Sequence, residues 1–273
     1  VNTVNRAYQL LARQGLVESH ARRGTVVCAG AVSLAASTDG ATEVRCVGSH
    51  DFCLDLLARQ LRPAGVQLTI HVTGSVAGLQ ALAAGRAMLA GCHLLDSDGT
   101  DYNHDAVARQ LPRQSTRLIT LIEREQGLIV PRGNPRRLRI VADLAQPALH
   151  LINRQTGSGT RLLFDRLLAQ AGIAPDDLAG YDRVAETHLA VAAAVAAGSA
   201  DVGLGIAAAA RALDLDFVPL VQERYDLVLL SESLTQPWFG PLIETLAAPQ
   251  FRTAAEALGG YDGTHTAWIR PAR

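Results

Sequence analysis

The chain has 273 residues, of which 48% are hydrophobic and 19% are charged, and its formal net charge at pH 7 is −1. This length suits one large or two medium domains with cores of their own. The near-zero charge argues against a protein that binds nucleic acid over its whole surface, and no apolar run of about eighteen residues predicts a membrane span.

The cysteines and the first residues indicate the compartment. Cys28, Cys46, Cys53 and Cys92 form no Cys-x-x-Cys pair and no zinc-ligand spacing, so we expect no metal cation and a reducing environment. The chain does not start with the charged segment and apolar core of a secretory signal. These features together predict a cytoplasmic protein without a membrane partner.

Residues 1–29 predict a helix followed by a basic hairpin. Apolar residues recur at helical spacing over residues 3–15, and Gly15 ends the pattern. Short strands are expected at 16–19 and 25–27, on either side of an arginine-containing turn. The small, polar residues 30–42 are typical of a linker.

From residue 44 onward the chain alternates between strand and helix patterns, which indicates an α/β fold. The strands are expected at 44–47, 66–72, 87–91, 118–122, 128–130, 148–152, 201–205, 217–221 and 226–230. The helices are expected over 54–61, 78–84, 162–168 and 187–197, followed by two helices separated near Pro249.

The most informative stretch is residues 153–161, Asn-Arg-Gln-Thr-Gly-Ser-Gly-Thr-Arg, between an expected strand and an expected helix. Its glycines let the backbone approach a ligand closely. Unpaired backbone N–H groups and the positive end of the helix dipole attract anions to such a turn. The alternative is that Ser158 serves only as the helix cap.

A similar pattern occurs elsewhere in the chain. Residues 75–91 and 188–205 each form a turn, an alanine-rich helix, a glycine-containing stop and a short strand that ends in glycine. Ser49 and Ser158 both open expected helices after expected strands. Two similar halves, each with Ser- or Thr-led helix N-termini, predict two lobes that face one cleft.

These motifs together resemble the periplasmic-binding-protein-like domain fused to helix-turn-helix regulators, a family associated with molybdate. They stand at residues 49–51, 74–79, 93–96, 102–103, 124–130, 133–135, 153–161, 187–188 and 223–227. The resemblance implies a two-lobed type II fold over residues 43–273. Lobe 1 would comprise about 43–129 and 228–273, lobe 2 about 130–227, with hinge strands near 128–130 and 225–228.

The N-terminal residues resemble the recognition helix and wing of GntR-like regulators, which are winged-helix proteins. The two helices that precede the recognition helix in that family have no counterpart in the sequence. By this resemblance, the residues that would contact DNA are Asn2, Thr3, Asn5, Arg6, Arg22 and Arg23. The alternative is a remnant that no longer binds DNA.

The ligand expected from the resemblance is molybdate or tungstate, with no separate cofactor. A micromolar complex needs about 8 kcal/mol, whereas each charge-assisted hydrogen bond gives roughly 1.5–3 kcal/mol and association costs about 4 kcal/mol or more. Donors from both lobes are therefore required. The candidate ligand-binding residues are Ser49, Gly74, Ser75, Arg154, Ser158, Gly159, Thr160 and Thr187.

The sequence thus predicts an oxyanion sensor that regulates transcription, with DNA as a partner if the winged helix is complete; a homodimer is compatible with this. One alternative is the receptor of an oxyanion transporter. Another is a sensor of small organic acids or amino acids, because Asp51, Asp96 or Asp201 would suit a ligand amine. Catalysis is not expected, since the chain has no Gly-x-Ser-x-Gly elbow and no metal-binding pair of histidines.

Overall fold

The computed structural model describes residues 17–20, 24–27 and 41–272, and the chain divides into two units, residues 1–40 and 41–273. In the first unit, β1 (Val17–His20) and β2 (Gly24–Val27) pair antiparallel, which confirms the predicted hairpin. The expected recognition helix lies outside the described residues. So do the DNA-contact candidates Asn2, Thr3, Asn5, Arg6, Arg22 and Arg23.

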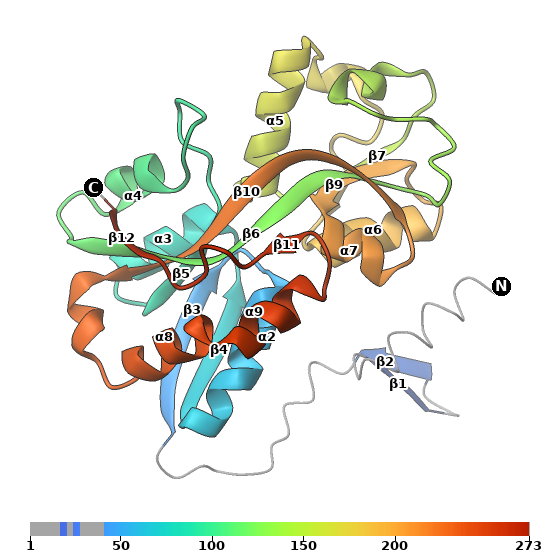
Figure 1. Ribbon diagram of the computed structural model, residues 1–273. Helices are drawn as coiled ribbons and strands as arrows, with labels where there is room; N and C mark the ends of the chain where they lie inside the picture. Colours follow the sequence, from blue (N-terminus) through green and yellow to red (C-terminus); the bar gives the residue numbers. More distant parts are fainter. Residues whose placement is uncertain (1–16, 21–23, 28–40, 273) are drawn as a thin grey trace. The chain divides into compact units, whose positions relative to one another are not determined.

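The second unit has the predicted two-lobed α/β fold (Figure 1). In lobe 1, three strands, β3, β4 and β5, pair in parallel. Helix α2 packs against α8 and α9, and helix α3 packs against α4. Its elements are β3 (Thr42–Gly48), α2 (Phe52–Leu61), β4 (Val66–Val72), α3 (Ser75–Ala83), β5 (Leu89–Cys92), α4 (His104–Gln110), α8 (Phe239–Ala247) and α9 (Pro249–Glu256).

Lobe 2 repeats this arrangement with parallel strands and helices of its own. Its core gathers apolar side chains of the strands and of α5, such as Leu151, Leu163, Phe164 and Leu204, all buried. Its elements are β7 (Leu151–Arg154), α5 (Gly159–Ala171), β8 (Val184–Ala185), α6 (His188–Ala196), β9 (Val202–Ile206) and α7 (Ala207–Ala212).

Two long strands, β6 (Thr116–Val130) and β10 (Asp216–Leu230), connect the lobes. They pair antiparallel in the middle of the strand order β4-β3-β5-β10-β6-β9-β7-β8. Near one end, β6 pairs with β12 (Ile269–Ala272) of lobe 1, and near the other it pairs with β9 of lobe 2. The passage between lobes therefore lies between residues 120 and 126 of β6, whereas the sequence suggested 128–130.

The prediction of two separate strands in each of these regions was wrong, because each region is one strand of 15 residues. Polar residues at 123–126 and 222–226 interrupt the apolar pattern and imitate a loop. In the structure Arg124, Gln126 and Glu223 of these segments are buried and paired with one another. The short α4, α7, β8, β12 and β11 (Tyr261–Asp262) were not predicted.

Within the described residues, no helix combines the length and the apolar character that a membrane crossing requires.

Helix α3 lies unusually close to β3. A Cβ atom placed on Gly78 would stand 2.5 Å from the Val47 carbonyl oxygen and 2.8 Å from the Gly48 Cα. Both neighbours are backbone atoms, so they cannot turn aside as a flexible side chain would. This contact fixes the N-terminal end of α3 against the end of β3, which helps to place the turns of lobe 1.

We predict that Gly78→Ala lowers the free energy of unfolding by roughly 1–3 kcal/mol, the usual cost of overpacking, in urea denaturation. The control is Gly240→Ala, in α8, where a Cβ would meet no atom within 4 Å. Alanine favours a helix over glycine, so this variant should be as stable as the wild type or slightly more stable. Equal stability of all three proteins would contradict the close packing of α3 on β3.

Candidate functional site

A buried ion-pair network joins the two connecting strands to lobe 1. Arg124 of β6 lies opposite Glu223 of β10, and its Nε donates to the Glu223 carboxylate at 2.6 Å. Its Nη1 donates to Asp51 of lobe 1, which also accepts a hydrogen bond from Tyr261 at 3.0 Å. Arg124 and Asp51 are 0% exposed. The network therefore ties both connecting strands to lobe 1.

Every acceptor position of Glu223 is in use. Beyond Arg124, the carboxylate accepts hydrogen bonds from the side chains of Gln126 and His93, the latter at 3.0 Å. Burial by itself raises the pKa of Glu223, but the charges of Arg124 and His93 and these hydrogen bonds outweigh it and lower the pKa to about 2. Glu223 is thus a fully partnered carboxylate.

The three aspartates considered for a ligand amine also have internal partners. Besides Arg124 and Tyr261, Asp51 accepts a hydrogen bond from the backbone N–H of Cys53 at 2.7 Å, which makes it the N-cap of α2. Asp96 accepts from the backbone N–H of Asp105 at 3.0 Å. Asp201 accepts from the backbone N–H of His150 at 2.8 Å.

Lobe 1 contributes the hydroxyl pair Ser49 and Ser75 to the cleft. Their Oγ atoms lie 2.9 Å apart, and the Ser75 Oγ accepts from the backbone N–H of His93 at 3.3 Å. Two hydroxyls that share one hydrogen bond keep one O–H proton free. Gly74, with φ 92°, is the N-cap of α3 and leaves the first N–H groups of that helix without a side-chain partner.

Lobe 2 contributes two helix N-termini. Ser158 caps α5 by accepting from the backbone N–H of Arg161 at 3.2 Å, and its own hydroxyl donates to the Gln155 carbonyl at 2.9 Å. Thr187 caps α6 by accepting from the backbone N–H of Ala190 at 3.1 Å. The Ser158 hydroxyl proton is therefore already bonded to the Gln155 carbonyl, whereas no described acceptor takes the Thr187 hydroxyl proton.

Two buried donors of lobe 2, close to the N-terminus of α5, have no partner among the described residues: Nη1 of Arg154 and Oγ1 of Thr160. The other two side-chain nitrogens of Arg154, Nε and Nη2, donate to the Gln155 side chain at 3.1 Å and to the Glu186 carbonyl at 2.9 Å. Burial, and after it the charge of Arg124, lowers the pKa of Arg154 to about 10. Arg154 remains a cation near neutral pH, and no described carboxylate pairs with it.

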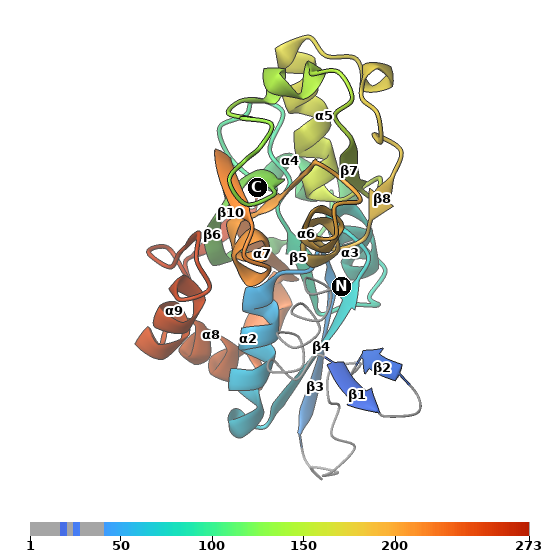
Figure 2. The same cartoon turned by 90° about the vertical axis from the view of Figure 1, so that its right-hand side faces the viewer.

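The turns of lobe 1 before α3 and after β5 contact the turn of lobe 2 before α5. A Cβ on Gly74 would lie 3.2 Å from the Gly157 carbonyl oxygen, and one on Gly159 would lie 2.6 Å from the His93 ring. Arg166 of α5 donates to the Asp96 carbonyl of lobe 1 at 3.1 Å. Of the eight candidate residues, seven are buried and Thr187 is half-buried. In Figure 2, α5 of lobe 2 lies above α2 and α3 of lobe 1.

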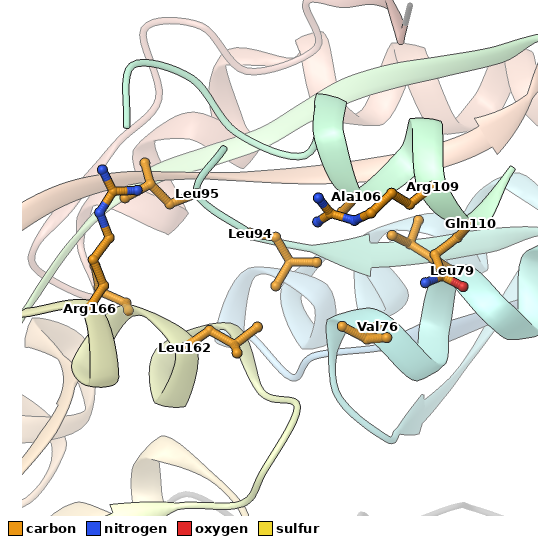
Figure 3. Close-up of a pocket in the computed structure, with 10 residues that line it drawn as sticks. Val76, Leu79, Leu94, Leu95, Ala106, Arg109, Gln110, Leu162 and Arg166 are labelled. Atoms are coloured by element: carbon orange, nitrogen blue, oxygen red, sulfur yellow. The ribbon is translucent and has the colours of Figure 1, made fainter. Parts of the chain in front are cut away.

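A second interlobe feature is a groove of about 190 Å³ that is lined by residues of α3, α4 and α5 (Figure 3). In the close-up, Leu162 and Val76 lie across the groove from Arg109, with Leu94 between them. Arg109 and Arg166 are the charged residues of a lining that is otherwise mostly apolar. An anion needs converging donors, which the buried cluster offers and this lining does not.

Sequence reasoning assigned no individual role to Arg124, Gln126 and Glu223, although their segments belong to the motifs of the resemblance. Arg124, Gln126 and Glu223 lie in strands, where charged residues normally indicate solvent exposure. The available signal was opposite charge on two strands that pair: Arg124 stands across from Glu223. Recognising it requires the register of β6 and β10, which a single sequence does not reveal.

Two lobes on paired connecting strands, with helix N-termini and unpartnered donors between them, define the class of hinged ligand-binding proteins. Residues 56–247 match the model of the PBP superfamily domain, and the chain belongs to this family. It is 32% identical over 228 residues to the uncharacterized protein YvgK of Bacillus subtilis (strain 168), a match that covers 83% of this chain and 73% of that protein.

Solved structures share the fold at low sequence identity. A putative phosphate ABC transporter substrate-binding protein from Clostridium perfringens, with bound phosphate, aligns with a TM-score of 0.60 at 13% identity, over 84% of this chain and 100% of that one. The tungstate ABC transporter structure from Geobacter sulfurreducens gives 0.56 at 14%, over 77% and 95%. CbnR, a LysR family transcriptional regulator, gives 0.50 at 17%, over 74% and 68%.

We predict that Glu223→Gln lowers the free energy of unfolding by roughly 3–5 kcal/mol near neutral pH, because Arg124 loses one buried partner. The folded pKa of Glu223, about 2, lies below the ordinary 4.5. The ionised carboxylate therefore stabilises the fold above pH 4.5, and this contribution is lost as the pH falls towards 2. Chemical denaturation across this range should show the variant approaching the wild type at low pH.

The control for this prediction is Glu232→Gln, at an exposed position. It should follow the wild type at every pH. A stability gap between Glu223→Gln and the wild type that does not narrow on acidification would contradict the assigned carboxylate.

Proposed function

We propose that this chain is the ligand-sensing part of a cytoplasmic transcription regulator and that its cleft binds molybdate or tungstate. The observation that carries the proposal is the pair of buried, unpartnered donors, Arg154 Nη1 and Thr160 Oγ1, at a helix N-terminus. Leaving such groups unpaired is costly, and an anion would satisfy both. Backbone N–H groups of α3, α5 and α6 and the free hydroxyl proton of lobe 1 would add donors.

The partnering of the carboxylates argues for an oxyanion without a proton. A ligand that keeps a proton near neutral pH, such as inorganic phosphate, needs an acceptor in its site. Asp51 and Glu223 have their oxygens occupied by Arg124, Tyr261, His93, Gln126 and the α2 backbone, so the side-chain oxygen acceptor of this cluster that is left without a partner is the neutral amide oxygen of Gln126. Molybdate, tungstate and sulfate carry no proton at this pH and need donors alone. This favours the tungstate-binding neighbour over the phosphate-binding one as a guide to the ligand.

The sensor would work by a shift of populations. An anion that contacts donors of both lobes stabilises the closed state only by its additional contacts there. The movement would be carried by β6 and β10, the only described strands that pair within both lobes. The hairpin of residues 17–27, its resemblance to a wing, and the likeness of the fold to CbnR support a regulator.

The alternative is a receptor of an oxyanion transporter, which the likeness to two ABC transporter proteins supports at the level of the fold. The wing-like hairpin at the N-terminus favours the regulator.

We predict that Thr160→Val weakens tungstate or molybdate binding by roughly 1.5–3 kcal/mol, about ten- to hundredfold in Kd, in isothermal titration. Valine keeps the shape of threonine, and the Thr160 hydroxyl has no internal hydrogen bond to lose. The matched control is Thr156→Val, at an exposed position of the same turn, which should bind as the wild type does.

The same titrations test the ligand class. Arg154→Ala should abolish measurable binding, whereas Arg132→Ala, at a side chain 75% exposed, should not. Phosphate should bind far more weakly than tungstate. Binding of none of molybdate, tungstate or sulfate by the wild type would refute the oxyanion proposal and direct attention to small organic acids and amino acids.

For the regulatory role, the full chain should bind DNA from upstream of its own gene with an affinity that changes when tungstate is added, measured by fluorescence anisotropy. Arg154→Ala should retain the DNA affinity of the anion-free protein and lose the response. DNA binding that is absent with and without anion would contradict the regulatory role of this chain, and it would leave the transport receptor or a remnant that no longer binds DNA.

A further inference from the structure

His188 is a buried polar residue that the proposed anion contacts leave unexplained. It is the first residue of α6 and is 2% exposed, and its Nδ1 has no partner among the described residues. Thr187 already caps the helix, so His188 is not needed for that role. Two other histidines of this region do have partners: His50 is bonded to Asp55 and His93 to Glu223.

The surroundings of His188 are positively charged. Burial lowers its pKa well below the usual value, and Arg154, Arg124, His93 and His50 lower it further. The helix N-terminus acts in the same direction. His188 is therefore neutral near pH 7 in the protein without an anion.

Among the elements packed against α6, only β6 carries carboxylates of its own. These elements are β6, β7, β8, β9 and α7. Strands β8 and β9 have no charged residue, and β7 contributes Arg154. Strand β6 contributes Arg124, which is paired with Glu223, together with Glu123, which is bonded to His265, and Glu125, which lies near Gly260. Arg211 of α7 faces Gly259, and Glu186, before α6, is exposed and contributes its carbonyl to Arg154.

The fixed charges of the buried cluster cancel. Arg124 and Arg154 are balanced by Asp51 and Glu223, all four of them buried. A dianion would therefore bring two uncompensated negative charges into the cluster. Three helix N-termini offset these in part, at about half a positive charge each. The neutral His188 is the nearby group able to supply a further positive charge by binding a proton.

We propose that His188 takes up a proton when a dianion occupies the cleft, so that anion binding is linked to pH. The inference rests on the proposed function of the same cleft. The proton comes from the solvent, and the ligand stays fully deprotonated. Affinity for the dianion should rise as the pH falls from about 8 to 6, by up to about tenfold per pH unit, where one proton is taken up per anion.

The test is isothermal titration of the full chain with tungstate, near neutral pH, in two buffers of different protonation enthalpy. The difference in apparent binding enthalpy gives the number of protons taken up. The wild type should take up close to one proton per anion. His188→Asn, which offers an amide nitrogen near the position of Nδ1 but does not titrate, should take up none and bind with little dependence on pH.

Two controls distinguish His188 from the other titratable groups of the chain and from a general loss of affinity. Thr160→Val should bind more weakly but take up the same number of protons as the wild type. His150→Asn, at a side chain 60% exposed, should match the wild type in both. A second measurement needs no variant of His188: its imidazole NMR signals, followed across pH, should titrate at higher pH with tungstate than without it.

Tungstate binding without proton uptake would overturn this inference and leave the proposed function intact. Proton uptake that persists in His188→Asn would also overturn it and would assign the proton to another group, such as His93. A wild type that binds no oxyanion would instead refute the proposed function itself.

Discussion

The cleft depends on the buried interaction of Arg124 with Glu223 and Asp51. The first two residues lie on the strands that connect the lobes, and the third caps the first helix of lobe 1. Burying three charges is expensive unless each has its hydrogen bonds. Here Tyr261, Gln126, His93 and the α2 backbone donate hydrogen bonds to the two carboxylates. The paired charges allow charged residues to lie in the middle of two core strands, and the network ties those strands to lobe 1.

This network also determines what the cleft offers to a ligand. With the carboxylates occupied, Arg154 stands as a buried cation without an anionic partner. The helices α3, α5 and α6 present their N-terminal ends to the same space. The carboxylates and guanidinium groups of the site are thus equal in number, but the carboxylates are occupied while Arg154 Nη1 and Thr160 Oγ1 have no partner among the described residues. Which ligands such a site binds therefore depends on which of its donors and acceptors already have partners within the protein.

The sequence predicted the alternation of strands and helices well, because β3, β4, α2, α6 and β9 have clear periodicity and glycine or Ser/Thr boundaries. It also indicated the helix N-termini, since capping residues and glycine turns are local signals. It did not predict that residues 116–130 and 216–230 are single strands, because their polar centres are stabilised by partners about a hundred residues away. The unpartnered state of Thr160 and His188 was equally hidden, since it depends on what every neighbouring atom does.

The contact between the turns before α3 and α5 has a kinetic consequence. The Gly74 backbone stands against the Gly157 carbonyl, and Gly159 packs on the buried His93 ring, which is itself held by Glu223. No long, flexible side chain stands at these contacts that could move aside for a bound solute, so its escape would require the two lobes to separate. Its residence time would then be set by the opening rate of the hinge, a motion of microseconds to milliseconds in such proteins. Substitutions in β6 and β10 far from any donor would therefore change the residence time of the solute without changing which solute is bound.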